Sequence, residues 1–143
     1  MHSTASPDLH PDETRFVEMV FPEQANHYGT LFGGHALQLM GKAAFIAATR
    51  RARQHVVMAS AENMIFDEPV RVGELIECVA SIARVGRSSM TVSVDLVHED
   101  ALTGLRRSAV RGTFEMVAVD TDGRPAPIFA SQERREIPEE AVP

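Results

Sequence analysis

The chain has 143 residues, 44% of them hydrophobic, which fits one ordinary domain with a sizeable core. Its 14 Lys and Arg residues stand against 20 Asp and Glu residues and give a formal net charge of -6. This balance argues against broad electrostatic capture of nucleic acid or of an anionic membrane surface. An anionic ligand would therefore need a local basic pocket.

The two ends of the chain differ in composition from its middle. Residues 1–14 indicate a loosely ordered tail and residues 131–143 a charged one, which leaves a single domain over residues 15–130. No signal peptide is recognisable at the start, and no apolar run reaches the roughly 20 residues of a membrane span. The one cysteine, Cys78, has no partner for an internal disulfide and lies in an apolar alternating run, which indicates a buried small hydrophobe. These features favour a cytoplasmic protein.

In chain order, the first predicted element is a strand at residues 15–21, which alternates in polarity and ends at Pro22. A glycine-rich turn over residues 26–35 follows. Residues 37–53 are predicted to form a helix, with cations at the C-terminal end, where they suit the helix dipole. Because only Gln38 and Lys42 interrupt its apolar surface, this helix should be wrapped by other elements on nearly every side.

Four further segments are rich in Val, Ile, Thr and Phe and are separated by turn residues, at 56–61, 75–85, 89–97 and 108–119. In the third of them apolar and polar residues alternate, so that one face packs and the other faces water. A single buried helix followed by a run of strands predicts an α+β domain. We expect a curved antiparallel sheet of about five strands around the helix.

The glycine-rich turn has features of a site that polarises a carbonyl group. Gly29, Gly33 and Gly34 permit a close approach that a Cβ would block, and the helix that follows aims unpaired N–H groups outward. A carbonyl oxygen placed there would be stabilised as negative charge develops on it. The alternative is a plain turn and helix cap. Asn26 could orient a water or hold the carbonyl, or it could only form an Asx turn.

Four sequence strings, taken together in order and spacing, resemble the hotdog-fold acyl-CoA thioesterases of the acyl-CoA hydrolase branch, the YciA-like enzymes. The strings are Asn26-x-x-Gly29-x-x-Phe32-Gly33-Gly34, Phe66-x-x-Pro69-Val70-x-Val72-Gly73, Val85-Gly86-Arg87-Ser88-Ser89 and Phe114-x-x-Val117-Ala118-Val119-Asp120-x-Asp122-Gly123-Arg124-Pro125. The resemblance covers roughly residues 15–128. It implies the hotdog fold, a homodimer that joins two sheets edge to edge, and often a hexamer made of three dimers. It also implies hydrolysis of acyl-CoA to coenzyme A and a carboxylic acid, with coenzyme A as part of the substrate and no required cofactor.

In the similar enzymes an Asp or Glu on the central helix is the general base or nucleophile, and counting from the double glycine places Gly41 at that position. Glycine inside a helix costs about 1 kcal/mol against alanine, so local stability does not explain it. Either it packs closely against a partner helix or the active site is weakened. Position 41 lies on the order of 12 Å along the helix from Gly33, so the two could meet at one carbonyl only across a dimer. An acyl-CoA binding or regulatory protein is therefore the alternative function.

Other residues could supply the base. Glu62 falls where the similar enzymes also carry an acidic residue near the site, although a strand-edge charge is the alternative. His27 and His35 flank the turn and titrate near neutrality, but a loop histidine is more often simply solvated. A hotdog hydratase would need an Asp/His pair close together on loop and helix, and Asn26-His27 is not such a pair.

The string Arg87-Ser88-Ser89 offers a guanidinium and two hydroxyls at a strand start, which are groups that bind phosphate. Because coenzyme A is a polyanion, this is the predicted basic pocket, with a solvated hairpin arginine as the alternative. Arg84 and Arg111 could add charge. A metal site is not predicted, because the histidines form no H-x-x-x-H pair and have no cysteine partner.

Overall fold

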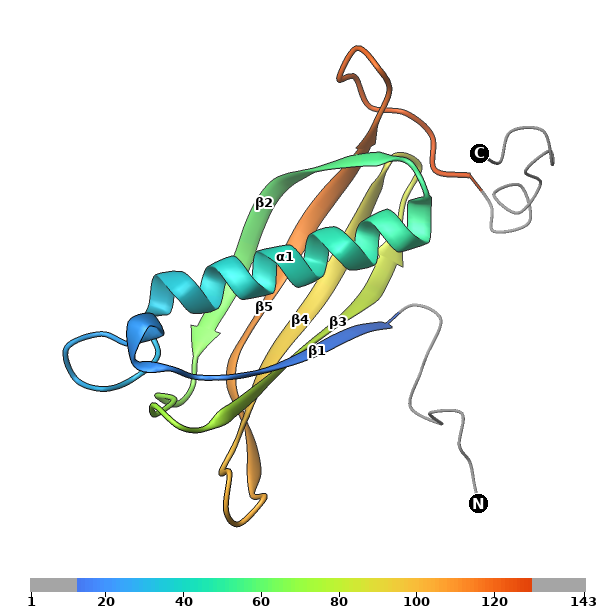
Figure 1. Ribbon diagram of the computed structural model, residues 1–143. Coiled ribbons are helices and arrows are strands. Elements are labelled where there is room, and N and C mark those ends of the chain that lie inside the picture. The colour runs from blue at the N-terminus through green and yellow to red at the C-terminus, as the bar shows by residue number, and fades with distance from the viewer. Residues whose placement is uncertain (1–12, 130–143) are drawn as a thin grey trace, which may run out of the picture.

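The computed structural model describes residues 13–129. Its elements are β1 (Glu13–Met19), a 3₁₀ turn (Pro22–Gln24), α1 (Gly33–Ala52), β2 (His55–Phe66), β3 (Leu75–Val85), β4 (Ser89–Glu99) and β5 (Arg106–Val119). The strands form one antiparallel sheet in the order β1-β3-β4-β5-β2, and α1 crosses one of its faces (Figure 1). The predicted α+β class and the hotdog arrangement of one long helix on a five-stranded sheet are confirmed.

The bounds of the elements differ from the predictions mainly at their ends. β1 spans Glu13–Met19 rather than 15–21, and α1 begins at Gly33 because the glycine pair forms its first turn. β2 continues to Phe66 through a bulge between Glu62 and Ile65, where the alternation slips. Most of the predicted tail 1–14, and all of 131–143, lie outside the described residues. Within 13–129, no helix combines the length and apolarity that crossing a bilayer requires.

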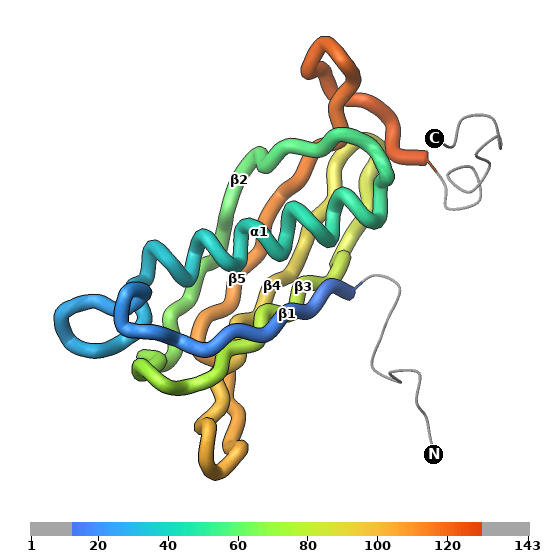
Figure 2. The backbone as a smooth tube through the Cα atoms, in the orientation of Figure 1, coloured from blue at the N-terminus to red at the C-terminus, as the bar shows by residue number. Residues whose placement is uncertain are grey.

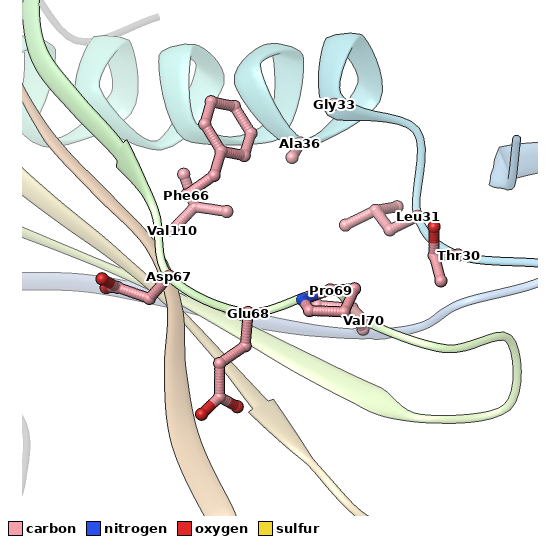
Figure 3. Close-up of a pocket in the computed structure, with 10 residues that line it drawn as sticks. All are labelled: Thr30, Leu31, Gly33, Ala36, Phe66, Asp67, Glu68, Pro69, Val70 and Val110. Atoms are coloured by element: carbon pink, nitrogen blue, oxygen red, sulfur yellow. The ribbon is translucent and has the colours of Figure 1, made fainter. Parts of the chain in front are cut away.

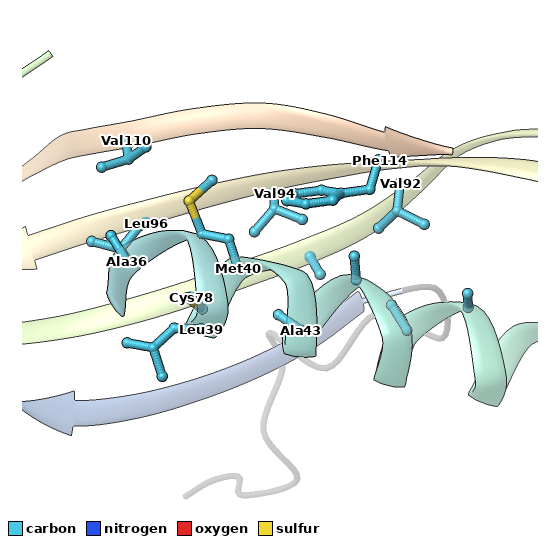
Figure 4. Close-up of a cluster of buried hydrophobic side chains, with 14 of the residues drawn as sticks. Ala36, Leu39, Met40, Ala43, Cys78, Val92, Val94, Leu96, Val110 and Phe114 are labelled. Carbon is cyan, nitrogen blue, oxygen red and sulfur yellow. The ribbon is translucent and has the colours of Figure 1, made fainter. Parts of the chain in front are cut away.

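The core lies between α1 and the sheet (Figure 4). Most of the buried side chains of α1 are alanines, which let the helix backbone approach the strands closely. They pack with buried residues of the central strand β4: Met90, Val92, Val94 and Leu96. Cys78 is buried in the same core, and burial raises the pKa of its thiol to about 12. The predicted role of Cys78 as a buried hydrophobe is therefore confirmed.

One side of α1 is open in the single chain, contrary to the prediction of a helix wrapped on nearly every side. Leu37 is 39% exposed and Phe45 is 45% exposed. The tube in Figure 2 shows β2 and β1 passing on either side of α1, and these two are the edge strands of the sheet. Exposed apolar residues of α1, with the exposed residues of the edge strand β2 that lie beside α1, make up what we call the α1/β2 face: Leu37, Phe45, Ile46, Met58 and Phe66. Apolar exposure on this scale marks a contact surface.

Candidate functional site

The N-terminal end of α1 presents two free backbone amides. Phe32 precedes the helix, and its side chain does not cap it. The amides of His35 and Ala36 both donate to the Phe32 carbonyl at 3.0 Å. Those of Gly33 and Gly34 have no acceptor among the described residues. Two N–H donors are therefore available at the positive end of the helix dipole.

Asn26 closes the turn that leads into this helix. Its Oδ1 accepts hydrogen bonds from the amides of Tyr28 at 2.9 Å and Thr30 at 3.2 Å, and from the Thr30 hydroxyl at 3.1 Å. The Asx-turn interpretation is thus confirmed. Its Nδ2 has no acceptor among residues 13–129, so the amide group that organises the turn can also donate outward.

The chain between β2 and β3, residues 67–74, supports the turn and is called the β2–β3 segment below. Leu31 donates from its amide to the Val70 carbonyl at 2.7 Å, and Val72 donates to the Gly29 carbonyl at 3.2 Å. Gly29 has φ 79, a left-handed conformation that favours glycine. The position of the turn therefore depends on the β2–β3 segment.

A cavity of about 300 Å³ opens beside Gly33 (Figure 3). Leu31, Phe66 and Val110 converge on it from the turn, β2 and β5, while the carboxylates of Asp67 and Glu68 point away from it. The complete lining is Thr30, Leu31, Gly33, Ala36, Phe66, Asp67, Glu68, Pro69, Val70 and Val110. An apolar hollow thus adjoins one of the free amides.

The two carboxylates at this cavity are already engaged in ion pairs. Arg111 donates from Nε to Oδ2 of Asp67 at 2.9 Å, and this contact raises the pKa of Arg111. Arg107 and His98 contact Glu68. Arg111 is therefore committed to Asp67, so the suggestion that it adds charge for a phosphate is not supported.

The two candidate histidines do not line this cavity. Gly34 and His35 border a different one, of about 370 Å³, together with Gln24 and Gln38. The Nε2 atom of His35 is buried and has no hydrogen-bond partner within residues 13–129. His27 stacks on Tyr28 instead, with ring centroids 4.0 Å apart.

Gly41 faces β2, and a Cβ there would meet only the flexible end of one side chain, which would have to shift slightly. A Cβ built there would lie 3.3 Å from Cε of Met58, with nothing else outside the helix within 4 Å. Packing within one chain therefore does not require a glycine at this position. Glu62 is exposed on β2, and its Oε2 accepts a hydrogen bond from the Ser60 hydroxyl at 3.0 Å. The next residue, Asn63, has φ 57 at the bulge.

Within a single chain, the predicted phosphate site lies far in space from the glycine-rich turn. The β3–β4 hairpin with Arg87, Ser88 and Ser89 is at the C-terminal end of α1, where Ile128 donates to the Arg87 carbonyl at 2.8 Å. The Arg87 side chain is exposed and has no partner among the described residues. The 20 residues of α1 extend about 30 Å. One chain therefore separates the Gly33 amide from Arg87 by roughly the length of the helix.

Two further predictions concern charge and metal. Arg84 forms a long ion pair with Glu115, at 3.9 Å. Within the part of the chain that the structure describes, no group of His, Cys, Asp or Glu residues is placed to hold a metal ion.

Residues 28–104 match the sequence pattern of the thioesterase superfamily. The chain belongs to this superfamily. Among its thioesterase relatives is the uncharacterised acyl-CoA thioester hydrolase YkhA of Bacillus subtilis, 33% identical over 124 residues, which cover 81% of this chain and 72% of YkhA. The resemblance inferred from the four sequence strings is confirmed at the level of the superfamily and of acyl-CoA hydrolase relatives.

Solved thioesterase structures share the fold of the chain. The acyl-CoA hydrolase of Staphylococcus aureus, determined with butyryl coenzyme A, coenzyme A and coenzyme A disulfide, superimposes with a TM-score of 0.79 at 30% identity, over 82% of this chain and 72% of that one. A hexameric acyl-CoA thioesterase in its apo form gives a TM-score of 0.80 at 32% identity, over 87% of this chain and 83% of that one.

Sequence reasoning did not find the cavity beside Gly33. Leu31, Phe66 and Val110 come from three elements that are far apart in the sequence, and each has the pattern of an ordinary core residue. The sequence signal was the position of four lining residues within two of the four strings: Gly33, Phe66, Pro69 and Val70. That signal points to the family but not to a cavity.

Proposed function

We propose that this thioesterase-superfamily protein hydrolyses acyl-CoA to coenzyme A and a carboxylic acid. The observation that carries the proposal is the free Gly33 amide beside an apolar cavity, with the free Gly34 amide next to it in the first turn of α1. When hydroxide adds to the thioester carbonyl, negative charge develops on the oxygen, and two prepositioned N–H donors stabilise it. The hydrolase relatives and the coenzyme A complex of a structural neighbour support this choice of substrate.

Asn26 has the second role in this proposal. Three hydrogen bonds to its Oδ1 fix the orientation of the side-chain amide, which leaves Nδ2 to donate to the thioester carbonyl or to the attacking water. The acyl chain would lie against Leu31, Phe66 and Val110 in the cavity. The tetrahedral intermediate then collapses, and the carbon–sulfur bond breaks to release the coenzyme A thiolate, which takes up a proton.

The working unit in our proposal is a homodimer, assembled further as a trimer of dimers. The α1/β2 face is apolar, and β2 is an edge strand whose free backbone groups could pair with β2 of a second copy. Such a dimer would bring Arg87, Ser88 and Ser89 of one chain toward the turn of the other, where they would bind coenzyme A phosphates. The hexameric neighbour supports this assembly.

We propose Glu62 as the general base that takes a proton from the attacking water. It is exposed on β2, the strand of the proposed dimer contact, and the Ser60 hydroxyl engages only one of its carboxylate oxygens. His35, with its unpartnered Nε2, is the second candidate. Gly41 would be the position where a helix carboxylate has been replaced.

An acyl-CoA binding or regulatory protein is the second candidate function. The observation that favours it is the absence of any side chain at Gly41, although space for one exists. The two functions differ in turnover but not in ligand.

Release of free thiol from acyl-CoA thioesters of several chain lengths tests the proposal. We expect thiol and carboxylic acid to appear in equal amounts at a rate well above the buffer rate. Tight binding of coenzyme A by calorimetry, without release above the buffer rate, would refute hydrolysis and establish the binding function. The Asn26→Asp variant is the control for a contaminating thioesterase, because only an activity of this chain will respond to it.

A further inference from the structure

His98 of β4 connects the two ends of the β2–β3 segment. Its Nε2 is 2.7 Å from Oε1 of Glu68, and its Nδ1 is 3.0 Å from Oε1 of Glu74. The side chain is only 13% exposed. A neutral imidazole carries one N–H and can donate to one carboxylate, whereas a protonated one donates to both. The geometry therefore matches an imidazolium held between two carboxylates.

The two carboxylates beside His98 favour its protonated form. The segment contributes Glu68 and Glu74, and β5 contributes Arg107, which is paired in register with His98 and donates to Glu68 at 3.3 Å. The register partner on β3 is the uncharged Ile76. Burial opposes the charged imidazole, but the hydrogen bonds to Glu74 and Glu68 outweigh it and raise the pKa of His98. The hydrogen bond from His98 in turn lowers the pKa of Glu68.

The residues between these two carboxylates hold the candidate site together. Residues 67–70 form one wall of the cavity beside Gly33. The Val70 carbonyl accepts a hydrogen bond from the Leu31 amide, and the Val72 amide donates to the Gly29 carbonyl. The same segment therefore holds the glycine-rich turn in place. The Glu74 side chain also bonds within the segment, since its Oε1 accepts a hydrogen bond from the Arg71 amide at 3.0 Å. A change at His98 thus reaches the turn through these hydrogen bonds and the short backbone of the segment that joins them.

We propose that protonated His98 is a positioning residue that holds the β2–β3 segment, and through it the cavity wall and the glycine-rich turn, in the binding geometry. The effect on acyl-CoA rests on the proposed function, whereas the clamp itself does not. A group whose pKa is raised by folding stabilises the folded arrangement at low pH and loses that effect as pH rises through the raised pKa. The segment should therefore loosen above the ordinary histidine pKa of about 6.5.

Amide hydrogen exchange with an NMR titration of His98 tests the clamp independently of turnover. We expect the protection factors of Leu31 and Val72, corrected for the intrinsic rate, to fall as pH rises through the measured pKa of His98. The fall should be on the order of tenfold for each unit by which this pKa exceeds that of a free histidine. His98→Asn should give low, pH-independent protection, and His98→Arg, a permanent cation with several donors, should restore it. Glu99→Gln, on the same strand as His98, removes one of the two carboxylate partners of Arg106 and should behave as wild type.

Kinetics supply the functional readout. The KM for acyl-CoA should rise with pH in the wild type once an appreciable fraction of the segment is open, in inverse proportion to the fraction that stays closed, with kcat little changed, and should stay flat in His98→Arg. Constant protection in the wild type across the His98 titration, or wild-type protection in His98→Asn, would overturn the clamp. A flat KM at a pH where the protection factors have fallen close to one would overturn its link to substrate. If no acyl-CoA is turned over, the proposed function fails and the exchange data alone decide on the clamp.

Discussion

At the scale of single residues, Asn26 shows how one side chain can serve structure and chemistry together. Its acceptor atom is consumed by the turn, while its donor atom is free among the described residues. Sequence reasoning reached both interpretations of Asn26 and could not choose between them, because an Asx turn and a substrate donor use the same residue type. The structure assigns the turn to Oδ1, and in our proposal Nδ2 is the atom that donates to substrate.

The pair Asn26→Asp and Asn26→Ala separates these two roles. Asp keeps an acceptor for Tyr28 and Thr30 but cannot donate, so we expect kcat to fall about 100-fold while the thermal midpoint stays near that of the wild type. Ala removes the acceptor too, so the turn amides should also lose protection from exchange. Wild-type kcat in Asn26→Asp would show that Nδ2 does not reach the reacting group.

Gly41 stands where our proposal places a replaced helix carboxylate. A Cβ there meets only the flexible end of Met58, so Gly41→Asp should fold normally. If this is the position of a lost base, we expect kcat for thiol release to rise about tenfold or more, since general base catalysis typically contributes larger factors than this. Gly41→Asn has the same shape without the charge and serves as the control. Equal kcat values in the two variants would contradict the assignment.

At the scale of elements, the interiors of the strands and of the helix could be predicted, but their irregular ends could not. The helix was predicted from residue 37 because the apolar pattern starts there, and glycines are poor helix formers. Gly33 and Gly34 nevertheless form the first turn of α1, because the chain enters from a turn fixed by Asn26 and the β2–β3 segment. The bulge in β2 was also missed, because a bulge depends on how β2 pairs with its neighbour β5, which the sequence of β2 alone does not show.

Gly112 of β5 lies opposite this bulge, between the register partners of Glu62 and Ile65. A Cβ at Gly112 would overlap the sulfur of Met64, which packs against the core there. We expect Gly112→Ala to lower the free energy of unfolding in urea by roughly 1–3 kcal/mol through overpacking. In a Met64→Ala background the same substitution should cost much less, because the overlap is gone. Equal costs in the two backgrounds would show that Met64 is not what excludes a side chain.

At the scale of the whole molecule, our proposal explains the apolar pattern of α1 by burial in an assembly rather than in one chain. The sequence predicted a helix wrapped on nearly every side, yet Leu37, Phe45 and Ile46 are exposed in the single chain. Periodicity records how much of a helix is apolar, but it does not say whether the covering element belongs to the same chain. The exposed side chains lie next to an edge strand, which is where a second copy can complete the sheet.

Phe45→Glu tests this surface. A carboxylate buried without a partner in the α1/β2 face should prevent association, so we expect monomers by sedimentation velocity at concentrations where the wild type is assembled. Thiol release should be lost with the dimer. Leu102→Glu, at a hairpin tip where the leucine is 96% exposed, is the control and should leave assembly unchanged. Dimers of Phe45→Glu with normal activity would place the interface elsewhere.

The claim that the thioester site is shared between two chains is tested most directly by mixing two inactive variants. In a dimer of one Asn26→Asp chain and one Arg87→Ala chain, one shared site carries both substitutions and the other carries neither. When the two variants are co-expressed in equal amounts, about half of the dimers are mixed, and we expect about one quarter of the wild-type thiol release. If each chain instead holds a complete site, every site carries one substitution, and the co-expressed protein would release no more thiol than the two variants purified separately.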